Sequence, residues 1–96
     1  MQWRIDVALR AAEAIRALDR ALRDEFIVRV DAISADPLAH VRRSLPPFEP
    51  IGAWVYEYAS EVVPGIFMLV IFTEPDAIAR TITMVQVRSL SRGVED

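Results

Sequence analysis

The sequence has no cysteine and no lysine, and it has one histidine and three glycines. Without cysteine, neither a disulfide framework nor a thiolate metal site is available. One histidine among scattered carboxylates does not give the clustering that a metal site requires. No Ser-His-acid arrangement, glycine-rich phosphate loop or lysine nucleophile can be assembled. We therefore expect no metal and no cofactor, and the chain carries no complete catalytic motif.

Long apolar runs and a basic charge balance are also missing. The longest uncharged run, Val62 to Thr73, contains Pro64 and Gly65 and is too short to span a bilayer. The first residues lack the basic start and apolar stretch of a signal peptide. We therefore expect a cytoplasmic protein without a membrane partner. With 11 basic and 14 acidic residues the net charge is −3, which disfavours indiscriminate nucleic-acid binding.

What is present suits one globular domain. The chain has 96 residues, of which 53% are hydrophobic, enough to bury a single core but not two. We expect this domain to occupy residues 1–90 and a flexible tail to occupy residues 91–96.

The first third of the chain predicts a short strand followed by helix. Residues 3–7 alternate between apolar and polar, as in a half-buried edge strand. Apolar residues then recur at helical spacings of three and four up to Asp36-Pro37, where the residue before proline leaves the α region. The pattern permits one long helix, but Asp19 could cap a second one, and we favour a helical hairpin. The expected helical stripe is Ile15, Leu18, Leu22, Phe26, Val30 and Ile33.

The remainder predicts a linker and three strands. Residues 38–50, with Pro46-Pro47, suit a surface loop. Strands are expected at residues 53–59, 66–72 and 78–87, and the unbroken apolar run of the second indicates a strand covered on both faces. The predicted fold class is therefore α+β: a short N-terminal strand, a helical hairpin, then an antiparallel three-stranded sheet. The helices should cover one sheet face, with Leu18, Leu22, Phe26, Val30, Val70 and Phe72 in the core.

The order of these elements resembles a known family. Asp36-Pro37 closes the helices, Gly52-Ala53-Trp54 opens the first strand of the sheet, and Val85 to Arg88 reads Val-x-Val-Arg. Together they resemble the RelE/ParE superfamily of toxins from bacterial toxin–antitoxin modules. The resemblance implies a helical hairpin packed on a twisted sheet, whose concave face is the active site in members that cleave messenger RNA on the ribosome.

The residues expected in that site depart from the family pattern. Cleavage of RNA needs cations that stabilise the charge developing on the phosphate. Val55, Glu57 and Phe67 stand where the cleaving members usually place basic residues, and a carboxylate there would repel a phosphate. Arg88 matches a catalytic basic position and is our first catalytic candidate; Arg80 is a weaker second one. We expect inefficient cleavage at most, and the chain's status as an enzyme stays open.

The apolar surplus predicts a surface that binds protein. Trp54, Tyr56, Tyr58 and Phe67 are the expected partner-binding residues, although packing in the core is an alternative for the three on the first strand. The resemblance implies a toxin neutralised by a cognate antitoxin, acting on ribosome-bound messenger RNA or on a topoisomerase, and leaves a homodimer open. The alternative is a catalytically inactive fold that works as a protein-binding module.

Overall fold

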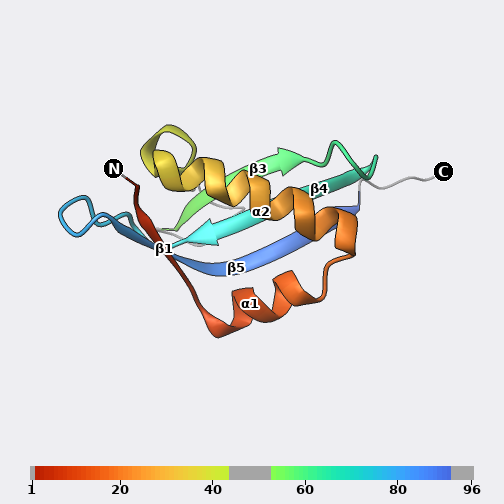
Figure 1. Ribbon diagram of the computed structural model, residues 1–96, viewed down its shortest axis with the longest axis horizontal. Coiled ribbons are helices and arrows are strands. Elements are labelled where there is room, and N and C mark those ends of the chain that lie inside the picture. Colours follow the sequence, from red (N-terminus) through yellow and green to blue (C-terminus); the bar gives the residue numbers. More distant parts are fainter. Residues whose placement is uncertain (1, 44–52, 92–96) are drawn as a thin grey trace.

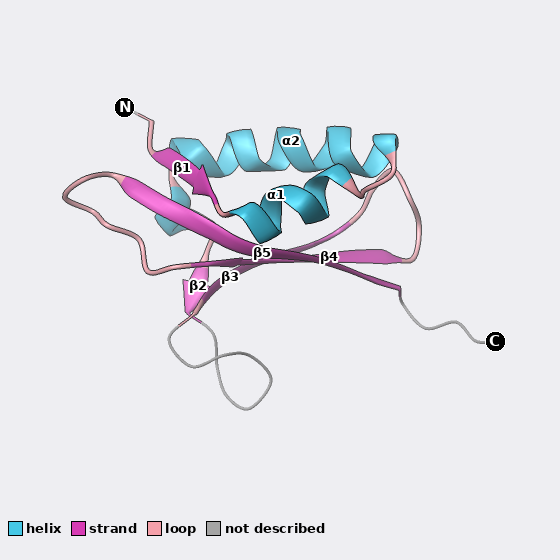
Figure 2. Cartoon of the chain, turned by 90° about the horizontal axis from the view of Figure 1, so that it is seen from below, coloured by secondary structure: helices cyan, strands magenta, loops and turns pink. Residues whose placement is uncertain are grey.

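A mixed sheet with two helices on one face forms the molecule (Figures 1 and 2). The computed structural model describes residues 2–43 and 53–91. Within these ranges the sheet has five strands in the order β1-β5-β4-β3-β2. The elements are β1 (Arg4–Val7), α1 (Leu9–Arg16), α2 (Arg20–Ala35), a 3-10 turn (Pro37–Ala39), β2 (Arg42–Arg43), β3 (Trp54–Ala59), β4 (Ile66–Phe72) and β5 (Thr81–Ser91).

The α+β class and the helical hairpin are confirmed. Asp19 occupies the N-cap position of α2, but its side chain makes no capping hydrogen bond. The α2 helix ends at Ala35, and Asp36 leaves the helical conformation before Pro37, as the sequence predicts. Its 16 residues make α2 longer than α1, and among the described residues no helix has both the length and the apolar character needed to cross a membrane.

The core lies between the helices and one face of the sheet. Phe26 and Ile33 of α2 pack in it with alternate residues of β4, namely Met68, Val70 and Phe72. Alternate side chains of a strand point to the same face, so β4 presents these three together. Ile82, Met84 and Val87 of β5 complete the sheet side, and Leu18 and Val30 pack against it half-buried. Leu22 is buried as predicted.

The sheet is larger than the three antiparallel strands that we predicted. The N-terminal strand β1 pairs in parallel with β5, at the edge of the same sheet. The predicted surface loop contains β2, which pairs antiparallel with Val55 and Trp54 of β3. The two arginines of β2 have no strand pattern of their own in the sequence. They form a strand because they pair with β3, which is distant in the chain. The predicted loop residues 44–50 and Gly52 lie outside the described residues.

The last strand is shifted toward the C-terminus relative to the prediction. The Asp76 carboxylate accepts hydrogen bonds from the backbone N–H groups of Ile78 (3.1 Å) and Ala79 (3.0 Å), which holds these residues in a turn. Ile78 is consequently 98% exposed, and β5 begins only at Thr81. The strand continues to Ser91, which pairs with Ile66. Residues 92–96 of the expected tail lie outside the described residues.

Candidate functional site

The sheet face opposite the helices carries the residues on which the functional resemblance rests. The register aligns Glu57 of β3, Leu69 of β4 and Arg88 of β5 in one row across the sheet. Their chain neighbours Tyr58, Val70 and Val87 lie in the core, so this row points away from the helices. No helix of the described residues covers that side (Figure 2), although Val55 and Ile71 on it are buried. We call it the open face: Arg42, Val55, Glu57, Ala59, Phe67, Leu69, Ile71, Gln86, Arg88 and Leu90.

The positions expected to be basic come together on the open face, but their side chains are not cationic. Val55 is fully buried, and Phe67 is half-buried beside Leu90 in the register. Arg88 is exposed and forms no ion pair with any described residue. Strands lie about 4.8 Å apart, so the backbones of Glu57 and Arg88 are separated by about 10 Å. None of these three positions supplies a cation, and the cations that the described residues place on the open face are Arg88 and Arg42.

An arginine from β2 changes the electrostatics of Glu57. Arg42 Nη2 donates a hydrogen bond to Glu57 Oε2 at 3.1 Å. Both side chains remain partly exposed, so the ion pair is screened by water and contributes little to stability. Its main effect is local, because the guanidinium offsets the negative charge that would otherwise repel a phosphate. The sequence alone could not show this pairing, since it depends on the register of β2 against β3.

The two catalytic candidates are not brought together. Arg80 precedes β5 in the turn, with a positive φ of 55°. Arg88 lies eight residues further along an extended strand, about 25 Å away. Arg43, next to Arg42, stands opposite Trp54 and so belongs to the helix-covered face. Of these arginines, Arg88 and Arg42 share the open face, and Arg80 and Arg43 do not.

The four expected partner-binding residues lie on different faces. Trp54, Tyr56 and Tyr58 alternate along β3 toward the helices, whereas Phe67 lies on the open face. Tyr58 is only 6% exposed and packs in the core. The four residues therefore do not form one surface. The three aromatic residues of β3 share the helix-covered side because they are spaced by two, and Phe67 lies on the other side.

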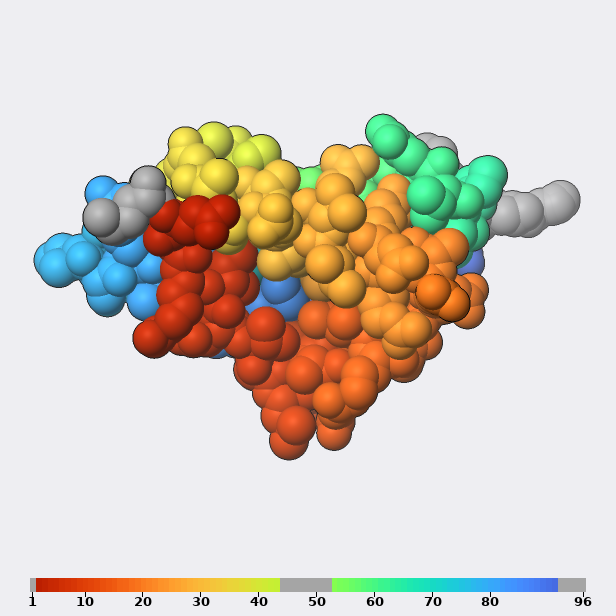
Figure 3. Space-filling view, viewed as in Figure 1, coloured from red at the N-terminus to blue at the C-terminus, as the bar shows by residue number. Residues whose placement is uncertain are grey.

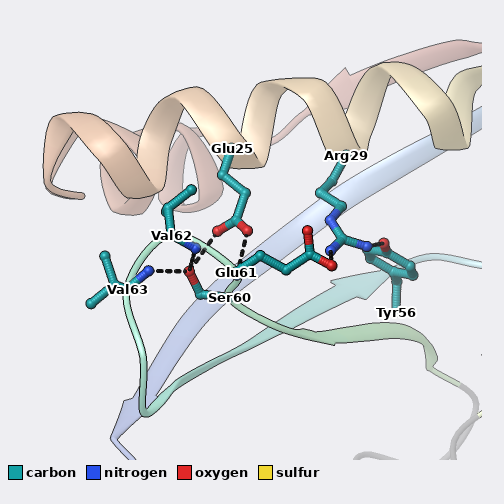
Figure 4. A network of polar contacts seen from close by, with 7 residues as sticks. All are labelled: Glu25, Arg29, Tyr56, Ser60, Glu61, Val62 and Val63. Atoms are coloured by element: carbon teal, nitrogen blue, oxygen red, sulfur yellow. Dashed lines mark hydrogen bonds and ion pairs between the residues drawn. The ribbon is translucent and has the colours of Figure 1, made fainter.

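A polar cluster that the sequence did not reveal joins α2 to the end of β3 (Figure 4). Glu25 accepts hydrogen bonds from Ser60 Oγ and from the backbone N–H of Glu61, both at 2.7 Å. One helical turn later, Arg29 donates to Tyr56 Oη at 3.4 Å and pairs with Glu61 at 3.6 Å. The hydrogen bond with Tyr56 raises the pKa of Arg29. These contacts hold α2 against β3 and against the turn that follows β3.

Tyr58 carries a buried hydroxyl group next to this cluster. Arg29 stacks over its ring at 4.6 Å, but the buried hydroxyl has no hydrogen-bond partner among the described residues. Burial, together with the charge of Glu25, raises the pKa of Tyr58 to about 12. An unsatisfied buried hydroxyl lowers stability. We therefore expect Tyr58→Phe to leave the free energy of unfolding unchanged or to raise it by about 1 kcal/mol.

Alkaline pH provides the matching test. The folded protein retains the Tyr58 proton up to about pH 12, whereas the unfolded chain loses it near pH 10. The raised pKa of Tyr58 therefore makes the free energy of unfolding depend on pH. Its contribution is complete below pH ~10 and is lost as the pH rises toward ~12, by about 1–2 kcal/mol after allowance for solvent screening. The sequence has no lysine to titrate in that range. Urea unfolding at pH 8 and pH 11.5 should show a smaller loss in Tyr58→Phe than in Tyr56→Phe. Equal losses would contradict the assignment.

In the described ranges, no three histidine or carboxylate side chains are grouped so that they could hold a metal ion. The arrangement that remains is an open, partly apolar sheet face with Arg88 and the Arg42–Glu57 pair. Such a surface can contact a phosphate or an acidic group at Arg88 and apolar groups at Phe67, Leu69 and Leu90.

Comparison with known proteins finds similarity in structure rather than in sequence. No model of a known protein family matches the chain, and no curated protein sequence matches it significantly. Among solved structures, a chain of the RelBE2 toxin–antitoxin complex from Mycobacterium tuberculosis matches with a TM-score of 0.74 and 11% identity, covering 94% of this chain and 100% of that one.

Two further structures agree. The isolated E. coli RelE toxin matches with a TM-score of 0.64 and 15% identity over 95% of this chain and 87% of that one. A chain of the RelE–RelB complex from Pyrococcus horikoshii gives 0.57 and 13% over 97% and 98%. At these identities the likeness establishes the fold: the chain has the fold of the RelE toxins.

Proposed function

We propose that this protein is the toxin component of a type II toxin–antitoxin module and is neutralised by a protein antitoxin. The observation that carries the proposal is the extent of the likeness, which covers 94% of this chain and the whole of a chain from a toxin–antitoxin complex. A chain that matches such a component over this extent is expected to work in the same kind of complex.

The open face supports an action on a target. It combines an exposed cation, Arg88, with apolar side chains, and no described helix covers it. Ribosome-bound messenger RNA and a topoisomerase are the two targets that the family resemblance implies. Arg88 would contact a phosphate in the first case and an acidic protein surface in the second.

A second candidate function follows from the same face. Val55 and Phe67 replace cations, and Glu57 places a carboxylate among them. These features favour a RelE-like fold that has lost catalysis and binds protein only. In that case the chain should still form a complex with its partner but should not harm the cell.

Controlled expression in a bacterial host distinguishes the two. We expect expression of the chain alone to arrest growth, and co-expression of the small reading frame next to its gene to restore growth and to yield a stoichiometric complex. Arg88→Ala should relieve the arrest without preventing complex formation, because Arg88 lies on the open face. Normal growth with the wild-type chain, at protein levels verified by immunoblot, would contradict the toxin proposal. A complex formed without any arrest would favour the second candidate.

A further inference from the structure

The N-terminal strand β1 forms one edge of the sheet, and Figure 3 shows it at the surface of the molecule. The Arg4 N–H donates to the Arg80 carbonyl of the neighbouring chain segment at 2.9 Å. Because successive residues of a strand direct their backbone groups to opposite sides, the N–H and C=O groups of Ile5 and Val7 point away from β5. No described strand pairs with β1 on that side. An edge of this kind is a template for a further strand.

The charged side chains of β1 do not keep a second copy away from this edge. Charges of one sign on an edge strand repel another copy, because like charges directly opposite each other are destabilising. Arg4 and Asp6 carry opposite charges instead, and they pair within the strand at 3.1 Å. Ile5 between them packs against the core, so both charged side chains point to the other side of the sheet. Their side chains are 72% and 47% exposed, which leaves them accessible to a second partner.

Antiparallel pairing of two copies of β1 makes these charges complementary. With the two-fold axis at Ile5, Arg4 of each copy stands opposite Asp6 of the other. The two Ile5 residues then exchange both N–H···O bonds, and the Arg4–Asp6 pairs occupy the non-hydrogen-bonded positions, where opposite side chains lie closest. An axis at Asp6 would place two carboxylates opposite each other. The charges therefore select the register centred on Ile5.

Apolar side chains stand beside the same edge. Val7 and Leu9 are 44% and 71% exposed, and Val7 lies on the same side of the strand as Ile5. In the register centred on Ile5, Trp3 of each copy stands opposite Val7 of the other. The Trp3 N–H is held by the Ser34 carbonyl at 2.8 Å, which limits the hydrogen bonds between the copies to the middle of β1. So short a contact predicts a dimer that forms only as the protein concentration rises.

We propose that the β1 edge is a self-association surface, on which a second copy of this chain adds its own β1 in antiparallel orientation. The five-stranded sheets of the two copies then join into one continuous sheet. Each copy presents the same strand to the other, so the contact is a two-fold one that closes after two copies. The inference concerns the purified chain alone and does not rest on the proposed toxin function.

Charge variants at the edge test the proposal. Sedimentation equilibrium of the purified chain in low salt should show a monomer–dimer equilibrium. Arg4→Asp and Asp6→Arg each place like charges opposite each other at two positions, and each should weaken dimerisation by at least about 30-fold. The double variant Arg4→Asp/Asp6→Arg makes the charges complementary again and should restore the wild-type dissociation constant within about threefold. Exposed ion pairs contribute little to folding, and circular dichroism verifies that each variant is folded.

A second exposed Arg–Asp pair provides the matched control. Arg20 and Asp24 pair at 4.0 Å at the start of α2, with side chains 89% and 69% exposed. Arg20→Asp and Asp24→Arg make the same changes of net charge away from β1, and each should alter dimerisation by no more than about threefold. Equal weakening by Arg20→Asp and Arg4→Asp would mean that net charge alone governs association and would overturn the proposed register.

Amide hydrogen exchange locates the contact. The Ile5 N–H should exchange more slowly as the protein concentration rises, whereas the Asp6 N–H, which faces β5, should be protected equally at all concentrations.

Three outcomes would overturn the proposal. The first is a chain that stays monomeric at about 1 mM in low salt. The second is a dimer that the double variant fails to restore. The third is exchange at Ile5 that slows only when the protein encoded by the neighbouring reading frame is added, because the edge then takes a strand of that protein. Growth arrest is measured separately, so each of these results leaves the toxin proposal as it stands.

Discussion

We expect the purified protein to cut ribosome-bound messenger RNA at least about 100-fold more slowly than a messenger-RNA-cleaving member of the RelE/ParE superfamily assayed in parallel. Loss of one group that stabilises developing charge costs about 10²–10³ in rate. On the open face, Val55, Glu57 and Phe67 occupy three positions expected to be basic. Arg42 offsets Glu57 at 3.1 Å but does not add a net cation there.

Primer extension on translating ribosomes measures the cuts. Arg88→Ala and Arg80→Asn form the control pair, because Arg88 lies on the open face and Arg80 lies in the turn before β5. Asparagine tolerates the positive φ at position 80 better than most residues do. Strong, discrete cuts that disappear in Arg88→Ala and persist in Arg80→Asn would show that the chain is an efficient nuclease after all. The Arg42–Glu57 pair would then be the next candidate for proton transfer.

Phe26→Ala is expected to destabilise the protein by about 3–5 kcal/mol. Phe26 is 2% exposed and packs between α2 and the sheet, so its removal leaves a cavity in the core. A domain of this size is typically stable by only about 5–10 kcal/mol, and the variant should be largely unfolded at moderate urea concentrations. Urea denaturation followed by tryptophan fluorescence measures the change.

Ile27→Ala is the control for this effect. It removes a large apolar side chain from the next position of the same helix, but at a site that is 56% exposed. We expect a loss of no more than about 1 kcal/mol. Similar losses in the two variants would show that the helix packs with a different face toward the sheet.

The local pattern of the chain predicted most of the elements. Helical spacing and Asp36-Pro37 located α2, and seven consecutive apolar residues located β4 with its observed bounds. These signals involve residues close together in the chain, so they can be interpreted without knowledge of the fold. The early start predicted for the last strand was wrong because the Asp76 side chain holds residues 78 and 79 in a turn.

Features that depend on distant pairing were not predictable. The sequence does not show that Arg42 pairs with Glu57, or that Glu25 accepts a hydrogen bond from the Ser60 hydroxyl. Each contact depends on how elements far apart in the chain are placed against each other. The aromatic residues of β3 illustrate the same limit. Their spacing shows that they share a face, but only the position of α2 decides that this face is the core.

The parallel pairing of β1 with β5 has a consequence for the order of events during synthesis. Val7 stands opposite Met84, and both residues line an apolar hollow of about 200 Å³ together with Ile15, Phe26, Ile27 and Val30 of the two helices. A ribosome adds about 5–20 residues per second, so several seconds separate the synthesis of these two walls. The nascent N-terminal half therefore cannot form this hollow, which is complete only after β5 has been made and has paired with β1.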